Sequence, residues 1–579
     1  MTTGRARRCS PRSFPGPVSV GLVGCALLVT AAACGGSKLR RFPPQAPVLR
    51  VDDRRPYAPA PESFYSPYIW DGANYSVFRP ASRYWLFETK KPALDVNALD
   101  EVPNSSWFIN RLSARPMTPE EVHRGACHDA DDTPALPWTV VGGKPDGANP
   151  GFQAKDADGT RFLVKVDGVV QPERATTADV VGAALFHAAG YWVPCNRVAF
   201  IRKEDLQLKA GAEVRRTNGT VEPLTQETID AIMSKATEVE PGLYRVSLSE
   251  FISGRPIGPF RYEGLRDDDW NDTIPHQHRR SLRAMRLLAA WIEHVDTRQE
   301  NTMLAWIQTS DDGTGYTRHY RIDFGESFGI VAGPNGIPQR LGHAGYFDLG
   351  QMATDFVTLG LLDRPWYDKD PNPAGVVLGY YRADTFDAES WEPGYPNPAF
   401  DAATEADNAW MARIIARLTP DHIRALVARA HLKNEDMARE IVRVMTARRQ
   451  KMLERYLTRL SPLAWPEVRD GRVCLQDLAV WTRTRDLATR RWRAEAHLEG
   501  AGSRSVNVRP ADDAWVCVEV PRVPDAGPDA PKYLVVDVVA SSVGRETTGP
   551  ARLHFWDDGE GTPMLVGLER PRDAKEPRL

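Results

Sequence analysis

The sequence has few cysteines, no excess of either charge, and one long hydrophobic run, which lies near its N-terminus. With 73 Lys and Arg against 76 Asp and Glu, the formal net charge is −3, so the basic surface typical of nucleic-acid-binding proteins is absent. No later apolar run reaches the ~18 residues that a membrane-spanning helix needs. The H-E-x-x-H motif of zinc peptidases is also absent. An extracellular hydrolase therefore has little support.

The first residues have the pattern of an export signal. The apolar residues 18–33 follow a basic segment that contains Arg5, Arg7, Arg8 and Arg12, and this order is typical of a signal peptide. Ala31-Ala32-Ala33-Cys34 resembles the cleavage site of a bacterial lipoprotein, although leucine is usual in place of Ala31. We therefore expect Cys34 to carry lipid at a bacterial membrane, facing the periplasm or the cell exterior. A plain secretory signal is the alternative.

The remaining cysteines indicate an oxidising compartment. If Cys34 carries lipid, four remain, which are Cys127, Cys195, Cys474 and Cys517. An even number suits disulfide formation outside the cytoplasm. Cys474 and Cys517 lie in one region and are candidates for a pair, while isolated buried thiols fit the sequence equally well. No Cys/His spacing indicates zinc.

Residues 291–329 hold the strongest functional pattern. An H-x-D-x-x-x-x-N run ends at Asn301, and Asp323-Phe324-Gly325 follows after two short apolar segments and a Gly/Asp/Ser-rich turn, which predict a hairpin. In phosphoryl transfer, a catalytic Asp lies five positions before a metal-binding Asn, and the Asp of DFG binds metal. We therefore predict Asp296 as the base and Asn301 and Asp323 as metal ligands. A surface hairpin with ordinary capping acids is the alternative.

A glycine-rich segment and a strand lysine precede this pattern. Residues 138–165 predict a strand, a loop and two more strands, although the loop does not match G-x-G-x-x-G. Backbone amides could approach phosphates closely at the glycines of this segment, which are Gly142, Gly143, Gly147 and Gly151. Lys144 adds positive charge there. Lys165, in FLVKVD, occupies the place of the kinase lysine that contacts the α- and β-phosphates. A solvent-facing strand lysine is the alternative.

The next helix offers an acidic partner for Lys165. We expect it to begin at Thr176 or Thr177 and to end at Gly190. Asp179 and Glu173 are the candidates, and Asp179 could instead only complement the helix dipole. Further along, Glu250 ends an apolar strand where a hinge would meet adenine, and this assignment depends on position alone.

Three segments together resemble the atypical protein-kinase-like superfamily: FLVKVD, HVDTRQENTML and YRIDFGESFG. They look closest to phosphatidylinositol 3-/4-kinase and HipA-type catalytic segments, and stretches such as VNALDEVPNSSWFINR resemble exported bacterial proteins with the same core. The resemblance covers roughly residues 95–460. It implies ATP and Mg²⁺ or Mn²⁺ between two lobes, with Lys165 binding ATP, Asp296 catalytic, and Asn301 and Asp323 holding metal.

Two departures bear on regulation and substrate. Val295 stands where an Arg usually precedes the catalytic Asp, and no Ala-Pro-Glu follows. Without that Arg, a phosphorylated activation loop lacks its usual docking partner, so we do not expect control of this kind. The acceptor stays open.

The predicted fold class is α+β: a two-lobed kinase-like fold with an N-terminal extension and a C-terminal β-sandwich, in a chain long enough for about three or four domains. A helix over 276–295 leads into the catalytic segment, and seven short β segments follow residue 460. The predicted parts are a signal peptide (1–33), a flexible tether (34–60), the extension (61–135), an N-lobe (136–257), a helical C-lobe (258–460) and a β-rich domain (461–579).

Two functions remain in competition. The first is a membrane-anchored phosphotransferase that passes phosphate, or AMP, from metal-bound ATP to an unknown protein, lipid or glycan acceptor. Lys165, Asp296, Asn301 and Asp323 are all residues that can perform the chemistry expected at their positions. An inactive relative usually loses the lysine, the base or a metal ligand. The scarcity of ATP outside the cytoplasm counts against it. The second is a non-catalytic surface lipoprotein with a pseudokinase fold that binds a partner or glycan. Metal-dependent nucleotide binding separates the two.

Overall fold

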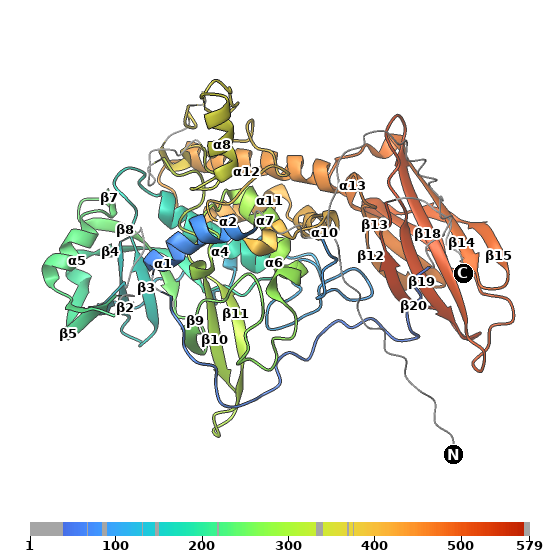
Figure 1. Cartoon of the computed structure of the whole chain (residues 1–579), viewed down its shortest axis with the longest axis horizontal. Coiled ribbons are helices and arrows are strands. Elements are labelled where there is room, and N and C mark those ends of the chain that lie inside the picture. Colours follow the sequence, from blue (N-terminus) through green and yellow to red (C-terminus); the bar gives the residue numbers. More distant parts are fainter. Residues whose placement is uncertain are drawn as a thin grey trace, which may run out of the picture. The chain divides into compact units, whose positions relative to one another are not determined.

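The computed structural model describes residues 39–66, 68–83, 90–129, 131–144, 150–216, 219–331, 340–367, 370–373 and 376–572. Residues Arg41–Pro577 form one compact unit. It mixes helices with several β-sheets (Figure 1), as predicted for the α+β class. The two-lobed layout stays a prediction. The expected signal peptide and Cys34 lie outside the described residues, and none of the described helices is both long and apolar enough to cross a membrane.

The largest sheet has the strand order β4-β8-β3-β2-β1-β5-β6, with β7 paired to β8. Neighbouring strands are antiparallel except β1 and β5. Side chains alternate along them, so that one face buries a core with helix α5 (Gln226–Met233). The strands are β1 (Trp138–Gly143), β2 (Gly151–Lys155), β3 (Arg161–Lys165), β4 (Asn196–Arg202), β5 (Leu206–Arg215), β6 (Val221–Pro223), β7 (Thr237–Glu240) and β8 (Leu243–Glu250).

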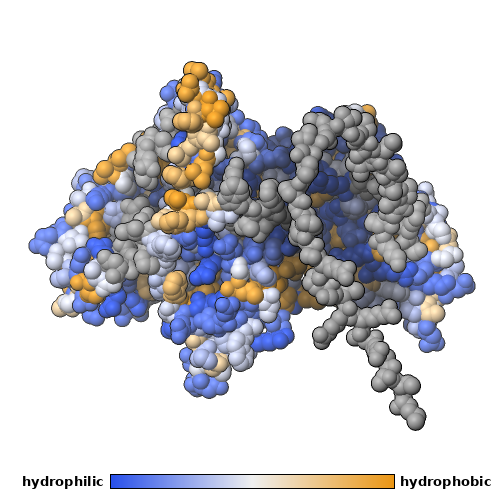
Figure 2. Space-filling model, viewed as in Figure 1, coloured by the Kyte–Doolittle hydropathy of each residue, from blue (hydrophilic) through white to orange (hydrophobic). Residues whose placement is uncertain are grey.

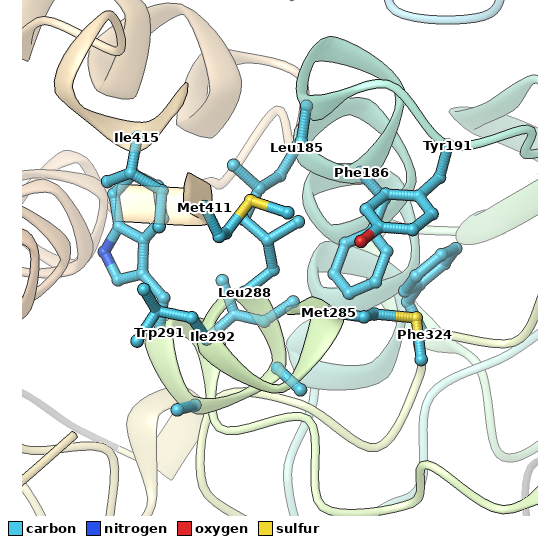
Figure 3. Close-up of a cluster of buried hydrophobic side chains, with 14 of the residues drawn as sticks. Leu185, Phe186, Tyr191, Met285, Leu288, Trp291, Ile292, Phe324, Met411 and Ile415 are labelled. Carbon is cyan, nitrogen blue, oxygen red and sulfur yellow. The ribbon is translucent and has the colours of Figure 1, made fainter. Parts of the chain in front are cut away.

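A second core lies among the helices. Figure 3 shows Leu185 and Phe186 meeting Leu288, Trp291 and other apolar side chains there. The contributing helices include α4 (Arg174–Ala189), α6 (Arg280–Arg283), α7 (Met285–Ile292), α9 (Pro398–Asp401), α10 (Glu405–Ala416), α11 (Pro420–Ala428) and α12 (Glu435–Tyr456). The α4 side chains belong to this core rather than to the core of the large sheet.

Two predicted helix boundaries are wrong. The segment 276–295 is a 3₁₀ turn at His276–His278 followed by α6 and α7, which are separated at Ala284. Helix α4 begins at Arg174 rather than at a threonine cap, because Thr176 lies inside it and bonds to the carboxylate of Asp167. Its end at Gly190 is confirmed.

The predicted hairpin after the catalytic segment is confirmed. Strands β10 (Thr302–Gln308) and β11 (Gly315–Arg321) are antiparallel, and β9 (Arg255–Gly258) pairs with β10 on the other side. This pairing brings the two ends of the hairpin, Asn301 and Ile322, within one backbone hydrogen bond of 3.1 Å. The two residues expected to bind metal therefore flank one hairpin: Asn301 immediately precedes β10, and Asp323 lies two residues after β11.

The C-terminal residues form two antiparallel sheets that share one core. The disulfide between Cys474 and Cys517 is confirmed, and it joins residues that lie opposite each other in neighbouring strands. The predicted β segment over 472–481 turns into helix α13 (Leu478–Trp481) after Asp477, whose carboxylate accepts from Ala479 N–H. The strands are β12 (Leu463–Arg469), β13 (Arg472–Asp477), β14 (Arg490–Leu498), β15 (Gly502–Val506), β16 (Val508–Pro510), β17 (Trp515–Glu519), β18 (Lys532–Ser542), β19 (Ala551–Asp557) and β20 (Met564–Glu569).

The flexible tether predicted for 34–60 is wrong for its described residues from Phe42 onward. Phe42 is buried, its N–H donates to the Tyr533 hydroxyl at 3.0 Å, and its ring meets His554. Tyr57 is buried beside Gly315, with backbone hydrogen bonds in both directions. Aromatic side chains fix this segment because their burial removes apolar surface from water.

The N-terminal extension packs against the helical core through Trp107 and Phe108. It contains α1 (Tyr68–Ala73), a π-helical turn (Asn74–Phe78), α2 (Arg79–Arg83) and α3 (Pro119–Arg124). Thr118 caps α3 through a reciprocal capping box with Glu121.

Asp100 joins the extension to the helical and C-terminal parts. Its carboxylate lies 2.6 Å from Arg280 Nη1, 3.1 Å from Arg413 Nη2 and 2.6 Å from Arg570 Nη1. Burial alone would raise the pKa of Asp100, but the three guanidinium groups hold it below its ordinary value. One ionised carboxylate therefore neutralises charge from three separate parts of the chain.

Replacing Asp100 with Ala should destabilise the fold by about 3–5 kcal/mol, because the buried guanidinium groups lose their shared counter-charge. Thermal and urea unfolding of the full chain measure this loss. Asp436→Ala, which removes one partner of an exposed Arg439 ion pair on α12, is the control and should leave the melting temperature unchanged. Equal behaviour of the two variants would contradict the structural role of Asp100.

Candidate active site

Lys165, the last residue of β3, lies between two carboxylates. Its Nζ is 3.2 Å from Asp179 Oδ1 on α4 and 3.0 Å from Asp323 Oδ1 after β11. Burial alone would lower the pKa of Lys165, but the two carboxylates raise it above its ordinary value. The structure thus brings together three of the residues singled out in the sequence. Lys165 is 5% exposed, so it is not the solvent-facing strand lysine considered above.

Asp323 is held in an unusual conformation. Its φ is 57°, in the left-handed region that non-glycine residues rarely occupy. Burial alone would raise its pKa, but Lys165 and Lys144 hold the pKa below its ordinary value, so the carboxylate is ionised. The strained backbone therefore accompanies a charged group directed at Lys165.

Helix α4 fixes the Asp323-Phe324-Gly325 segment at several points. Phe324 is buried against Phe186 (Figure 3). Its backbone N–H donates to Asp179 Oδ1 at 3.3 Å. A Cβ atom on Gly182 would lie only 2.7 Å from Phe324 Cβ, so glycine permits this close approach. Arg174 Nη1 donates to the carbonyls of Gly325, at 2.6 Å, and Ser327, at 3.1 Å.

Asp296 and Asn301 lie on the loop that follows α7. Asn301 Nδ2 donates to the Asp296 carbonyl at 2.6 Å, which leaves the amide Oδ1 as the acceptor end of the side chain. The Asp296 carboxylate lies 3.1 Å from Arg298 Nε. Arg298 thus supplies a positive charge beside Asp296. The kinase pattern places an arginine immediately before the catalytic aspartate, so an arginine two residues after it was not expected.

Glu326 is a carboxylate that the sequence interpretation missed, although it directly follows the DFG motif. Burial, followed by the charge of Asp296, raises its pKa to about 7, while Arg174 acts in the opposite direction. His294 is influenced by the charges of both Asp296 and Asp323. These shared electrostatic neighbours place the two aspartates and Glu326 in one polar region.

Glu326→Gln should stabilise the protein in a pH-dependent way. Folded Glu326 keeps its proton up to about pH 7, whereas an unfolded glutamate ionises near ~4.3, so native stability falls as the pH rises through this window. Urea unfolding without metal should show the variant to be more stable than the original chain by roughly 1–3 kcal/mol near pH 8, and similar near pH 4. Glu495→Gln, at an exposed position, is the control. A gain that does not depend on pH would contradict this assignment.

The predicted phosphate loop is only partly supported. Gly142 and Gly143 belong to β1, and a Cβ on Gly143 would lie 2.2 Å from Val214 Cγ2, so packing against β5 explains that glycine. Gly151 in β2 is equally restricted, by the Val164 carbonyl. Gly147 lies outside the described residues. Lys144 lies close enough to Asp323 for the two charges to interact, and its role in phosphate binding stays a prediction.

The other two candidates differ in their surroundings. Glu173 precedes α4 with φ 65° and lies 4.0 Å from Arg245, so Asp179 rather than Glu173 is the partner of Lys165. Glu250 ends β8 opposite Phe162 of β3, three residues before Lys165. Its side chain is directed to Arg197 at 4.0 Å. Only the backbone position of Glu250 supports a role at a nucleotide base.

The sequence also contains one G-x-S-x-G pattern, Gly325–Gly329, which is the nucleophile motif of serine hydrolases. Ser327 is fully buried and its hydroxyl donates to the Phe324 carbonyl at 2.9 Å. The segment follows a hairpin strand rather than forming a strand-to-helix turn. Ser327 is therefore not presented as a nucleophile.

A second disulfide, Cys127–Cys195, joins the segment after α3 to the residue before β4. Asn196, next to Cys195, donates from Nδ2 to the Asp179 carbonyl at 3.2 Å. Arg429 of α11 donates to the carbonyls of Asn196 and His123. The disulfide, α3 and α11 are thereby connected to the helix turn that carries Asp179. The spacing of the cysteines did not identify this pair.

Removing this disulfide with Cys127→Ala and Cys195→Ala should loosen α4. We expect faster hydrogen exchange of the α4 amides and a loss of about 2–4 kcal/mol in stability. The matched control, Cys474→Ala with Cys517→Ala, should lose stability without faster exchange in α4, because its disulfide lies in the C-terminal sheets. Unchanged exchange of α4 in the first variant would contradict the proposed support.

No protein-family model matches the chain, and no curated protein matches it. A structure of the Golgi casein kinase with Mn/ADP bound matches at 10% identity, covering 56% of this chain and 73% of that chain, with a TM-score of 0.27. A second Golgi casein kinase structure matches at 9% identity, covering 56% and 71%, with the same TM-score. Both are kinases, but a likeness at this TM-score carries no argument by itself.

Proposed function

We propose that the chain is an atypical kinase-like phosphotransferase that uses metal-bound ATP. The observation that carries the proposal is the buried ion-pair cluster of Lys165, Asp179 and Asp323, formed from a strand, a helix and the segment after a hairpin. Phosphoryl transfer in kinases uses a strand lysine, an acidic helix partner and a DFG aspartate in these structural positions. Asp296 and Asn301 occupy the loop between α7 and the hairpin, as this chemistry requires.

Each residue has a distinct proposed role. Lys165 would contact the α- and β-phosphates, and Asp179 would orient it. Asp296 would accept the proton of the acceptor hydroxyl as that oxygen bonds to the γ-phosphorus and the bond to ADP breaks. Lys144 would add positive charge near the phosphates, since it already interacts with Asp323.

The available ligands fit Mg²⁺ or Mn²⁺. Asp323 is ionised, and the orientation of Asn301 leaves its amide oxygen as an acceptor, so both can offer the oxygen ligands that hard cations prefer. No group of three or more His, Cys, Asp or Glu suited to a metal occurs among the described residues. This agrees with a magnesium site completed by phosphates and water rather than by protein alone. When bound, the metal would neutralise phosphate charge.

Titration calorimetry of the full chain in detergent tests this function, with ATP in the presence and absence of Mg²⁺ or Mn²⁺. We expect metal-dependent binding that Asp323→Ala weakens at least about tenfold. Asp296→Asn should retain binding but lose phosphate transfer, which separates the two steps. Asp470→Ala, in an exposed turn, is the control.

Absence of nucleotide binding under every metal condition would overturn the phosphotransferase proposal. The competing function, a non-catalytic surface protein that binds a partner or glycan, would then be favoured. The exposed apolar residues of α8 (Leu349–Val357), described below, are the observation that favours a binding role.

We also propose that the chain is an exported lipoprotein anchored through Cys34. The two disulfides support an oxidising compartment outside the cytoplasm. Mass spectrometry of the N-terminal peptide from the membrane fraction tests the anchor. A lipid-modified Cys34 is the expected result. An N-terminal peptide without lipid would contradict the anchor and would favour a secreted protein.

A further inference from the structure

Helix α8 and the turn after it carry an exposed apolar surface, which we call the α8 ridge (residues 347–362). Phe356, Val357, Leu359 and Leu361 are 82%, 78%, 83% and 85% exposed. Figure 2 shows hydrophobic residues gathered on a projection at the place of α8 in Figure 1. Contiguous apolar surface of this kind marks interaction sites.

The ridge has a regular pattern. Leu349, Met352 and Phe356 recur at the spacing that places side chains on one face of a helix. No charged residue lies between Asp355 and Asp363. The apolar face is therefore continuous from the start of α8 through the turn that follows it.

The base of the ridge opens into a cavity of about 530 Å³. Phe347 and Leu349 line it from the ridge, and Trp391, Phe400 and Tyr456 provide aromatic walls. An apolar occupant of the ridge would thus extend directly into an aromatic cavity.

The charge inside the cavity favours a cation. Arg455 is already paired with Glu389 and Glu405, at 2.6 and 2.8 Å. Lys90 donates to the carbonyl of Ala403 at 2.9 Å, and Arg286 donates to the Ala388 carbonyl at 3.0 Å. These three cationic side chains of the lining therefore already bond to carboxylates or carbonyls of the protein.

Glu392 lines the same cavity and faces charges of its own sign. The side chain of Glu392 is accessible to solvent, and partial desolvation together with the charges of Asp348 and Asp401 raises its pKa, while Arg286 acts in the opposite direction. A guest ammonium or guanidinium group would relieve this repulsion and would also meet aromatic faces.

The cavity wall is joined to the catalytic loop. Gly394, between the lining residues Pro393 and Pro396, donates from its N–H to the Val295 carbonyl at 2.8 Å, next to Asp296. Its own carbonyl accepts from Tyr346 N–H at 2.7 Å. Two backbone hydrogen bonds thus connect the ridge side of the cavity to the proposed base.

We propose that the α8 ridge and this cavity bind the phosphate acceptor, and that the acceptor is a polypeptide segment with a basic side chain beside apolar ones. The basic group would enter the cavity near Glu392, and the apolar side chains would cover the ridge. This inference rests on the proposed phosphotransferase function. It goes further by assigning the acceptor class to a protein rather than to a lipid or glycan.

Charge favours this occupant over a lipid surface. Asp348 and Asp363 border the apolar face and Glu392 lies at its base, whereas Asp355 is already paired with Arg364 at 2.6 Å. Carboxylates in these positions disfavour an anionic bilayer, whereas they complement a basic polypeptide.

The test uses a fluorescent peptide library in which arginine or lysine adjoins leucine or phenylalanine, with libraries carrying glutamate or serine at those positions as controls. Binding to the full chain in detergent is measured by anisotropy without ATP or metal. Loss of this binding is therefore distinguishable from failure of nucleotide binding. We expect members of the basic–apolar library to bind and the control libraries not to bind.

Variants assign the binding to the ridge and the cavity separately. Leu359→Ser with Leu361→Ser, and separately Glu392→Gln, should each raise the Kd at least about tenfold. Leu487→Ser, at an exposed leucine in the C-terminal part, is the matched control and should not change the Kd. Circular dichroism confirms that each variant is folded.

The peptide experiment would overturn the proposal if no basic–apolar peptide binds, if both variants bind like the original chain, or if the glutamate library binds as well as the basic one. Ridge variants that lose only binding to zwitterionic vesicles, or only self-association in sedimentation, would assign the ridge to a lipid surface or a second copy and would also overturn it.

Discussion

The buried ammonium group of Lys165 is the interaction on which the candidate site depends. It is shared between Asp179 and Asp323, which come from segments far apart in the sequence. Charges removed from water are costly unless their partners are present with good geometry. The sheet, α4 and the segment after β11 must therefore be assembled together for this cluster to form.

Helix α4 meets this requirement through its packing. Its apolar side chains join the helical core, and Gly182 admits Phe324 at close range. The Cys127–Cys195 disulfide and Asn196 hold the turn of Asp179. In many kinases the corresponding helix is positioned by regulation. Here burial on all sides favours a site that is already assembled, in agreement with the absence of the Arg needed for control by loop phosphorylation.

Local patterns predicted the parts of the site that depend on spacing. The turn-rich segment before β11 defined the hairpin, and with it the positions of Asn301 and Asp323. The strand pattern around Lys165 and the expected start of the next helix limited its partner to two acids. Contacts between distant segments were not accessible in this way. The surroundings that raise the pKa of Glu326 and the Cys127–Cys195 pair both follow from tertiary packing, which one sequence without its fold does not contain. The contact of Arg298 with Asp296 is local, but it depends on side-chain orientations that the sequence pattern does not specify.

The glycines show the opposite error. Gly142 and Gly143 looked like a phosphate loop, but Val214 occupies the place of a side chain at Gly143, and a Cβ on Gly142 would come within 3.3 Å of the Glu213 carbonyl. A glycine needed for packing and a glycine needed for a ligand have the same appearance in a sequence. The tether prediction failed for a similar reason, since a proline-rich composition concealed two aromatic residues, Phe42 and Tyr57, that fix the segment to the fold.

The most direct test of the account is a crystal structure of the full chain with a non-hydrolysable ATP analogue and Mn²⁺. The account predicts that Lys165 leaves Asp323 for the phosphates while keeping Asp179, and that Asp323 and Asn301 coordinate the metal, with α4 unchanged. A nucleotide bound elsewhere, or a Lys165–Asp179 pair that is broken in the complex, would contradict it.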